Sequence, residues 1–149
     1  MGQTLSCLYL HIMIATHDRK PLLTGAIMAR LNKYIGDILR AEKCVLVDAG
    51  GTADHVHLLV SVRPNIAPGD VIRAFRGKTE KWVRETFPEA AAFEWQSGYS
   101  VFSVSHSNIE KVKEFIAKQD EHHRKASFRD ELVAILKKHG VEFDGRYVK

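Results

Sequence analysis

Two histidines separated by one residue lie in a stretch of alternating character, Asp54–Val60. In an extended strand, successive side chains point to opposite faces, so His55 and His57 would share one face and the apolar residues between them the other. Two neighbouring imidazoles can bind one divalent cation. They leave its coordination incomplete, so a further oxygen or nitrogen ligand must come from elsewhere. Because the chain has eight histidines, a chance pair at this spacing is the alternative interpretation.

A second candidate group lies far downstream, at Phe115 and Gln119. These residues are four apart, so in a helix they stack on one side. That side flanks an apolar stripe made of Ile109, Val112 and Ile116. The helix therefore offers an amide oxygen beside an aromatic ring at the edge of a core. The alternative is a core phenylalanine and a surface glutamine.

The periodicity of the apolar residues predicts four strands and four helices. The predicted strands are Leu5–Ala15, Cys44–Ala49, Asp54–Val62 and Tyr99–Ser105, and the predicted helices are Gly25–Glu42, one around Val71–Val83, one opening at Ser107–Glu110 and one from Ser127 to Gly140. Gly50–Gly51 is interpreted as the turn of a hairpin. The order βαββαβαα indicates an α+β fold, a ferredoxin-like or RRM-like antiparallel sheet with helices mainly on one face. Many unrelated functions use this fold, so function must be argued from the site.

Length and composition place few limits on function. A chain of 149 residues is expected to form one domain over 1–149. Its net charge of +4 permits an anionic partner without requiring one. No apolar run approaches the roughly 20 residues of a membrane span, and Met1–Ser6 lacks the features of a secretory signal. Cys7 and Cys44 have no CxxC spacing, so we expect a reducing, cytoplasmic setting.

The chain resembles the single-tyrosine HUH transposases, which are the TnpA-like enzymes of small insertion sequences, and their relatives, the REP-associated tyrosine transposases. The resemblance covers nearly the whole length. It rests on Asp54–Val60, Lys81–Val83, Trp95–Tyr99, Phe102–Ser105 and Phe115–Lys125. So many matches in order are far more specific than the histidine pair alone.

This resemblance implies a DNA transposase acting on single-stranded DNA, by metal-dependent cleavage and strand transfer through a 5′-phosphotyrosine intermediate. It implies that His55, His57 and Gln119 hold Mg²⁺ or Mn²⁺ and that position 115 is the nucleophile. It also implies a DNA hairpin at the element ends as the ligand, and a homodimer with composite active sites. The setting would be the nucleoid of a bacterial or archaeal cell.

The chain departs from the family at position 115, where Phe115 replaces the nucleophilic Tyr. A phenyl ring has no hydroxyl and cannot form a phosphotyrosine, so the chain as written is expected to be inactive. Two interpretations stay open: a deliberate replacement that traps a DNA complex, which the intact remainder of the site favours, or a naturally disarmed relative. Tyr147 and Tyr99 are weak candidates for a substitute nucleophile.

Basic residues on the second helix are candidates for contacts with DNA phosphates. Arg73, Arg76 and Arg84 share its outward face, with Lys78 and Lys81 to one side. Acidic residues interrupt this face, so a solvated helix surface is the alternative. 

Further basic residues and histidines receive weaker assignments. The segment His122–Lys125 extends the basic character past Gln119, and His122 is placed at the surface although it could approach the metal. His11 and His17 are interpreted as structural or exposed.

Two other functions compete with transposition. An RRM-like sheet with basic helices could be a non-catalytic module that binds single-stranded nucleic acid, a domesticated relative of the enzymes. A replication initiator or relaxase-like nicking enzyme would use the same HUH chemistry, but the short chain without a helicase region argues against it.

Overall fold

One open, antiparallel sheet organises the chain, with strand order β2-β3-β1-β4 over the residues that the computed structural model describes, 2–123 and 126–148. The strands are β1 (Tyr9–Ala15), β2 (Val45–Thr52), β3 (His55–Ser61) and β4 (Ser100–Val104). The helices are α1 (Gly25–Ala41), α2 (Pro68–Thr86), α3 (Ile109–Ala117), α4 (Gln119–His123) and α5 (Phe128–Lys138). Short 3-10 turns cover His17–Arg19, Pro88–Ala90 and His106–Asn108. The predicted α+β fold is confirmed.

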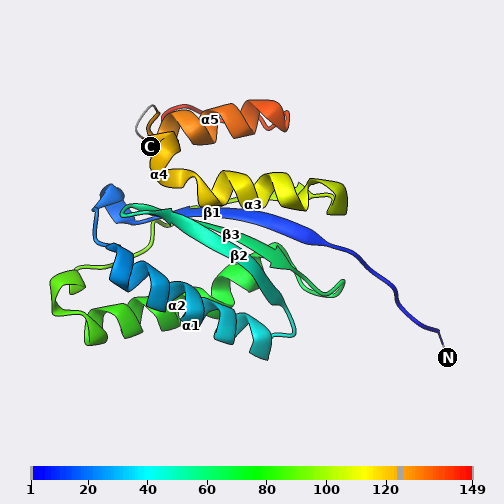
Figure 1. Ribbon diagram of the computed structural model, residues 1–149, viewed down its shortest axis with the longest axis horizontal. Helices are drawn as coiled ribbons and strands as arrows, with labels where there is room; N and C mark the ends of the chain where they lie inside the picture. The colour runs from blue at the N-terminus through cyan, green and yellow to red at the C-terminus, as the bar shows by residue number, and fades with distance from the viewer. Residues whose placement is uncertain (1, 124–125, 149) are drawn as a thin grey trace.

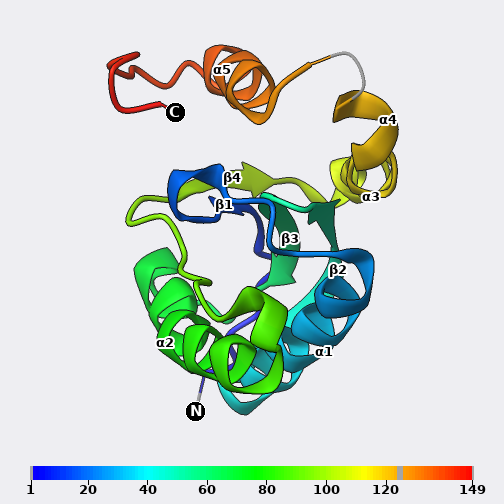
Figure 2. The same ribbon diagram turned by 90° about the vertical axis from the view of Figure 1, so that its left-hand side faces the viewer.

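Helices cover both faces of the sheet, rather than mainly one as predicted (Figures 1 and 2). α1 and α2 pack on one face, where Val56, Leu58 and Val60 of β3 are fully buried in the main core. α3, α4 and α5 lie on the other face. There Leu59 packs against Ile109 and Ile116 of α3. The predicted alternation of β3, with apolar residues on one face and histidines on the other, is therefore confirmed. The face that carries the imidazoles is covered by helices and not open to solvent.

α5 closes the far end of this second face. Its residues Phe128 and Leu132 pack against Met13 and Ala15 of β1. The helix begins where predicted, because the hydroxyl of Ser127 accepts a hydrogen bond from the backbone N–H of Asp130. It ends before Gly140, which has a positive φ of 65°. 

The prediction of a hairpin turn at Gly50–Gly51 was wrong. Both glycines belong to β2, where they pair with His57 and Val56 of β3, and the chain turns after Thr52 instead. A side chain at position 50 would lie 2.8 Å from Cγ2 of Ile116 on α3. The glycine therefore marks a close approach between a helix and a strand, not a turn.

Two other predicted boundaries differ. β1 begins at Tyr9 rather than Leu5, because Tyr9 pairs with the last residues of both neighbouring strands, β3 and β4. Leu5 is 81% exposed. The predicted third helix is divided at Lys118, so position 115 lies on α3 and Gln119 begins α4. Within the described part of the chain, no helix is long and apolar enough to cross a membrane.

Candidate metal centre

His55 begins β3 and is held by hydrogen bonds at its Nδ1. This atom lies 2.8 Å from Oδ1 of Asp54, and the same carboxylate accepts a hydrogen bond from the hydroxyl of Thr52. Burial alone would raise the pKa of Asp54, but the hydrogen bonds from His55 and Thr52 outweigh it and lower the pKa. The carboxylate is therefore ionised at neutral pH and accepts the Nδ1 proton of His55. The Nε2 lone pair of a neutral His55 is then free to act as a ligand.

The side-chain amide of Gln119 on α4 lies next to that lone pair. Its Oε1 lies 2.9 Å from Nε2 of His55. Both atoms are acceptors when His55 is neutral, so the contact calls for a proton or a cation that both can bind. His123 contributes a third atom at the same place, with Nε2 3.0 Å from Oε1 of Gln119.

His57 is fully buried and contacts a partner at each ring nitrogen. Nε2 lies 2.9 Å from Oε1 of Glu131, and Nδ1 lies 2.8 Å from Nε2 of His11 in β1. Burial lowers the pKa of His57 and lowers that of His11 to about 3, so both rings are neutral at neutral pH. When Nε2 of His57 is a ligand, its ring proton must sit on Nδ1, where Nε2 of His11 can accept it.

Glu131 supplies a carboxylate from α5. It is 7% exposed, and besides His57 it lies 3.2 Å from Nε2 of His123 and 3.9 Å from Nε2 of His55. Burial alone would raise its pKa, but the hydrogen bond and the charge interaction with His57 outweigh this and lower it. One ligand atom from each of His55, His57 and Glu131 lies within 4.8 Å of the others.

The spacing of these atoms fits a small divalent cation. With bonds of about 2.1 Å in octahedral geometry, adjacent ligand atoms lie about 3.0 Å apart and opposite atoms about 4.2 Å apart. The pairs His55–Gln119 and His57–Glu131 are both 2.9 Å apart, close to the adjacent spacing. Nε2 of His55 and Oε1 of Glu131, 3.9 Å apart, approach the opposite spacing. Two imidazoles, an amide oxygen and a carboxylate form a mixed nitrogen and oxygen donor set for a divalent cation.

The family assignment comes from comparison of the sequence with known families. The family model described as "Transposase IS200 like" matches residues 4–119. The chain belongs to this family of HUH tyrosine transposases. It is thus a transposase of the IS200 type, as the resemblance implied.

Similar proteins agree with this assignment. The ISDra2 transposase TnpA of Deinococcus radiodurans is 23% identical over 114 residues, which are 73% of this chain and 81% of the relative. A crystal structure of a Deinococcus radiodurans R1 protein assigned as a transposase matches with a TM-score of 0.65 and 24% identity, over 80% of this chain and 96% of that one. The structure of a REP-associated tyrosine transposase bound to a REP hairpin matches with a TM-score of 0.60 and 11% identity, over 83% of this chain and 74% of that one. Both structures support the fold.

Phe115 of this transposase lies beside the histidine cluster. Its ring centroid is 5.4 Å from that of His57 and 6.1 Å from that of His11, with near-perpendicular planes. The amide nitrogen of Gln119 also donates to the backbone oxygen of Phe115 at 3.3 Å. The structure therefore brings positions 115 and 119 to the same place despite the break at Lys118, and it does so within one chain.

Two residues of the transposase site escaped the sequence prediction. His11 was interpreted as structural or exposed; it is buried, as a structural residue would be, but its contact with His57 was not predicted. Glu131 lies beyond the 4–119 match, so no family motif pointed to it. A signal did exist: Glu131 interrupts the apolar stripe of α5 formed by Phe128, Leu132 and Leu136, which places a carboxylate on a buried helix face.

The basic residues of α2 lie across the sheet from the histidine cluster, because α2 covers the opposite face (Figure 1). Arg76 donates to the backbone oxygens of Gln96 and Ser97, and Arg84 donates to that of Phe93 at 2.6 Å. These two guanidinium groups thus anchor the segment that leads into β4. 

The other three predicted DNA contacts on α2 are exposed. Lys78 and Lys81 face solvent, and Arg73 pairs with Asp70 at the surface. These three side chains are therefore accessible to a ligand.

The remaining sequence assignments have mixed outcomes. Of the segment His122–Lys125, residues 124 and 125 and the side chain of His122 lie outside what the structure describes. His17 has a 52% exposed side chain, as expected. Tyr99 and Tyr147 line a separate pocket of about 220 Å³.

Proposed function

We propose that this transposase binds single-stranded DNA at a divalent-cation site formed by His55, His57 and Gln119, with Glu131 as a further ligand. The observation that supports this most is the convergence of their four ligand atoms at spacings that suit octahedral coordination. When bound, Mg²⁺ or Mn²⁺ supplies positive charge that stabilises the phosphate undergoing cleavage and its leaving oxygen.

The residues around the ligands fix their orientation. The Asp54 carboxylate, to which the hydroxyl of Thr52 donates, accepts the Nδ1 proton of His55, which keeps Nε2 available. His11 accepts the Nδ1 proton of His57 when Nε2 of His57 is a ligand. Helices on this face exclude bulk water from the imidazoles, since His55 and His57 are fully buried. A rigid, dry donor set of this kind strengthens electrostatic interactions with a bound phosphate.

Position 115 is the proposed place of the nucleophile. With Tyr there, the phenolic oxygen would form a bond to phosphorus while the bond to the 3′-oxygen breaks, leaving a 5′-phosphotyrosine and a free 3′-hydroxyl. Strand transfer would be attack by a 3′-hydroxyl on that ester. The ring of Phe115 lies against His57, so a hydroxyl added to it would start from the edge of the donor set. Without that hydroxyl, this chain binds DNA and metal but forms no covalent adduct.

A hairpin of single-stranded DNA is the proposed ligand, as in the solved complex of the REP-associated tyrosine transposase. We assign its phosphates to the basic face of α2. The contacts are chiefly those of the exposed Arg73, Lys78 and Lys81. The proposed assembly is a homodimer. The composite active sites that the resemblance implies would require the helix that carries Gln119 to exchange between subunits, because within one chain Gln119 contacts its own His55.

A non-catalytic module that binds single-stranded DNA is the second candidate function. The observation that favours it is Phe115 itself, since the other site residues are present without a nucleophile. Such a module needs no divalent cation for its affinity. A titration with Mn²⁺ therefore distinguishes the two functions.

The decisive experiment restores the hydroxyl with Phe115→Tyr. This variant should form an adduct with a single-stranded hairpin substrate that depends on Mn²⁺ or Mg²⁺, survives denaturing electrophoresis and carries the 5′ side of the cut. The parent protein and the double variant Phe115→Tyr/His57→Ala are the controls, and neither should form it. An adduct in the parent would place the nucleophile elsewhere. No adduct from the Tyr variant on a hairpin that it binds would support the non-catalytic module.

A further inference from the structure

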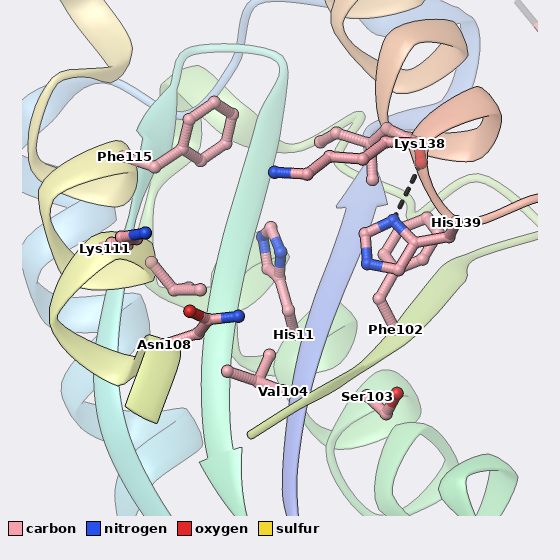
Figure 3. Close-up of a pocket in the computed structure, with 11 residues that line it drawn as sticks. His11, Phe102, Ser103, Val104, Asn108, Lys111, Phe115, Lys138 and His139 are labelled. Carbon is pink, nitrogen blue, oxygen red and sulfur yellow. Dashed lines mark hydrogen bonds between the residues drawn. The ribbon is translucent and has the colours of Figure 1, made fainter. Parts of the chain in front are cut away.

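A pocket of about 340 Å³ opens between α3 and α5, above β1 and β4 (Figure 3). Its size is within the range of pockets that hold small molecules or single nucleotides. The residues that line it and enter the argument below are His11, Phe102, Lys111, Phe115, Lys138 and His139. Neither lysine is among the candidate metal ligands, and Lys138 lies beyond the matched region 4–119.

The two side walls of the pocket are positively charged. Lys111 extends from α3 and Lys138 from α5, and both are exposed (Figure 3). No carboxylate is among the described residues that line the pocket. An anionic group that enters therefore meets two ammonium groups from different helices without acidic competition.

The exposed ring of His139 forms part of one wall, beside the buried ring of Phe102. The rings of Phe102 and His139 are 4.7 Å apart with planes tilted by 39°. Nδ1 of His139 lies 2.8 Å from the backbone oxygen of Ile135, so this nitrogen carries a proton and the ring is held in place. A fixed aromatic surface beside lysines is the combination that binds single-stranded nucleic acid, because bases stack while phosphates pair with cations.

The pocket adjoins the candidate metal centre, and Phe115 and His11 lie between the two. Phe115 lines it, and the ring of Phe115 contacts that of His57. His11 lies at its floor and shares a 2.8 Å contact with Nδ1 of His57. A ligand in the pocket would therefore lie directly beside the place where the phosphate is to be cut.

We propose that this pocket holds one nucleotide of a single DNA strand next to the scissile phosphate. Lys111 and Lys138 contact its flanking phosphates, and its base lies against the exposed ring of His139. This inference rests on the proposed function and adds the subsite that selects a single strand. A pocket of about 340 Å³ has room for a single nucleotide and not for a base-paired duplex.

The test compares two double variants that remove the same charge from the same helices. Lys111→Gln/Lys138→Gln changes the pocket. Lys113→Gln/Lys137→Gln changes neighbouring positions that do not line it. Binding of labelled oligothymidylate and of a blunt DNA hairpin is measured by fluorescence anisotropy over a series of salt concentrations, and thermal melting confirms that each variant folds.

The pocket variant should bind oligothymidylate roughly tenfold more weakly than the parent, with a salt slope lower by about one unit for each lysine. The control variant should stay within about twofold of the parent on the same probe. All three proteins should bind the blunt hairpin equally. Equal loss in both double variants, or none in either, would overturn the subsite while hairpin binding still supports the proposed function.

Competing ligands provide separate outcomes. Oligouridylate is compared with oligothymidylate on the same proteins. If both bind the parent with equal affinity and the pocket variant weakens both equally, the pocket accepts RNA, which contradicts a DNA-specific site. Displacement of oligothymidylate by low concentrations of inorganic phosphate would mean that the lysines bind a free anion and not a nucleotide. A parent protein that binds neither oligothymidylate nor the hairpin would contradict the proposed function itself.

Discussion

Oε1 of Glu131 on α5 lies 2.9 Å from Nε2 of His57 on β3. The two residues are 74 positions apart in sequence, and Glu131 lies beyond the matched family region 4–119. A helix outside that region thus contributes a buried carboxylate to the motif histidines. The ligand set that we propose for this transposase is therefore larger than the motif alone implies.

Metal affinity should depend on both Glu131 and His57. Glu131→Gln keeps the shape of the side chain but removes its charge, so we expect it to weaken Mn²⁺ binding by roughly tenfold to a hundredfold. His57→Ala should abolish binding measurable by calorimetric titration. Asp130→Asn is the matched control, since this exposed neighbour on α5 carries the same charge. Unchanged affinity in Glu131→Gln would remove Glu131 from the ligand set.

His11 should act through His57. His11→Leu removes the acceptor for Nδ1 of His57, so Mn²⁺ affinity should fall by roughly tenfold or more. The buried Nδ1 left without a partner should also lower the free energy of unfolding by about 1–3 kcal/mol. His11→Gln can still accept that proton and should recover part of both losses. Calorimetry and urea denaturation measure the two effects, with His17→Ala at the surface as the control. Equal losses in the Leu and Gln variants would argue for a packing role only.

The metal-free protein should lose stability as the pH falls below 6.5. Burial lowers the pKa of His11 from 6.5 to about 3, and it lowers the pKa of His57 as well. The unfolded chain therefore binds more protons in this range, and the free energy of unfolding decreases as the pH falls. Each imidazole that stays neutral contributes a slope of up to about 1.4 kcal/mol per pH unit. 

Urea denaturation in the presence of a chelator, repeated across this pH range, measures the slope. His11→Gln should reduce it, because that side chain does not titrate. A slope that the substitution leaves unchanged would assign the acid sensitivity to other groups.

Of the basic residues of α2, we expect Arg76 to affect stability and Lys78 and Lys81 to affect DNA binding. Arg76→Ala removes hydrogen bonds to the backbone oxygens of Gln96 and Ser97, so it should lower the free energy of unfolding by about 1.5–3 kcal/mol. Lys78→Ala and Lys81→Ala should leave stability within about 0.5 kcal/mol of the parent. Each should lower the salt slope of hairpin binding by about one unit. Unaltered hairpin binding in both lysine variants would place the DNA on another surface.

Much of the fold could be predicted because local patterns determine it. The alternation in β3 separates Val56, Leu58 and Val60 from the imidazoles, and the helix spacing of α1 and α2 gives apolar stripes that match the buried residues. Local patterns failed where a contact between distant segments decides the outcome. Gly50 resembles a turn residue in sequence, and only the approach of α3 explains why a glycine is needed inside β2.

The site could be predicted only as far as its motifs extend. His55, His57 and Gln119 come from spacing and family resemblance, and the structure brings their ligand atoms together. His11 lies on a neighbouring strand, and sheet order is needed to place it beside His57. Glu131 required knowing that α5 returns over the second face of the sheet. The assignment of Arg76 as a DNA contact overlooked the loop carbonyls to which it donates.

The close approach at Gly50 has a consequence for tolerance to mutation. Gly50 pairs with His57 in the sheet and lies beneath Ile116, which is next to position 115 and near Gln119. One added methyl group there would lie 2.8 Å from the Ile116 side chain and 3.1 Å from its backbone oxygen, which leaves α3 no room to remain where it is. The distance between α3 and β3 is therefore set by a residue with no side chain and no chemical role. Gly50→Ala would move positions 115 and 119 away from His55 and His57, although every residue of the site itself is unchanged.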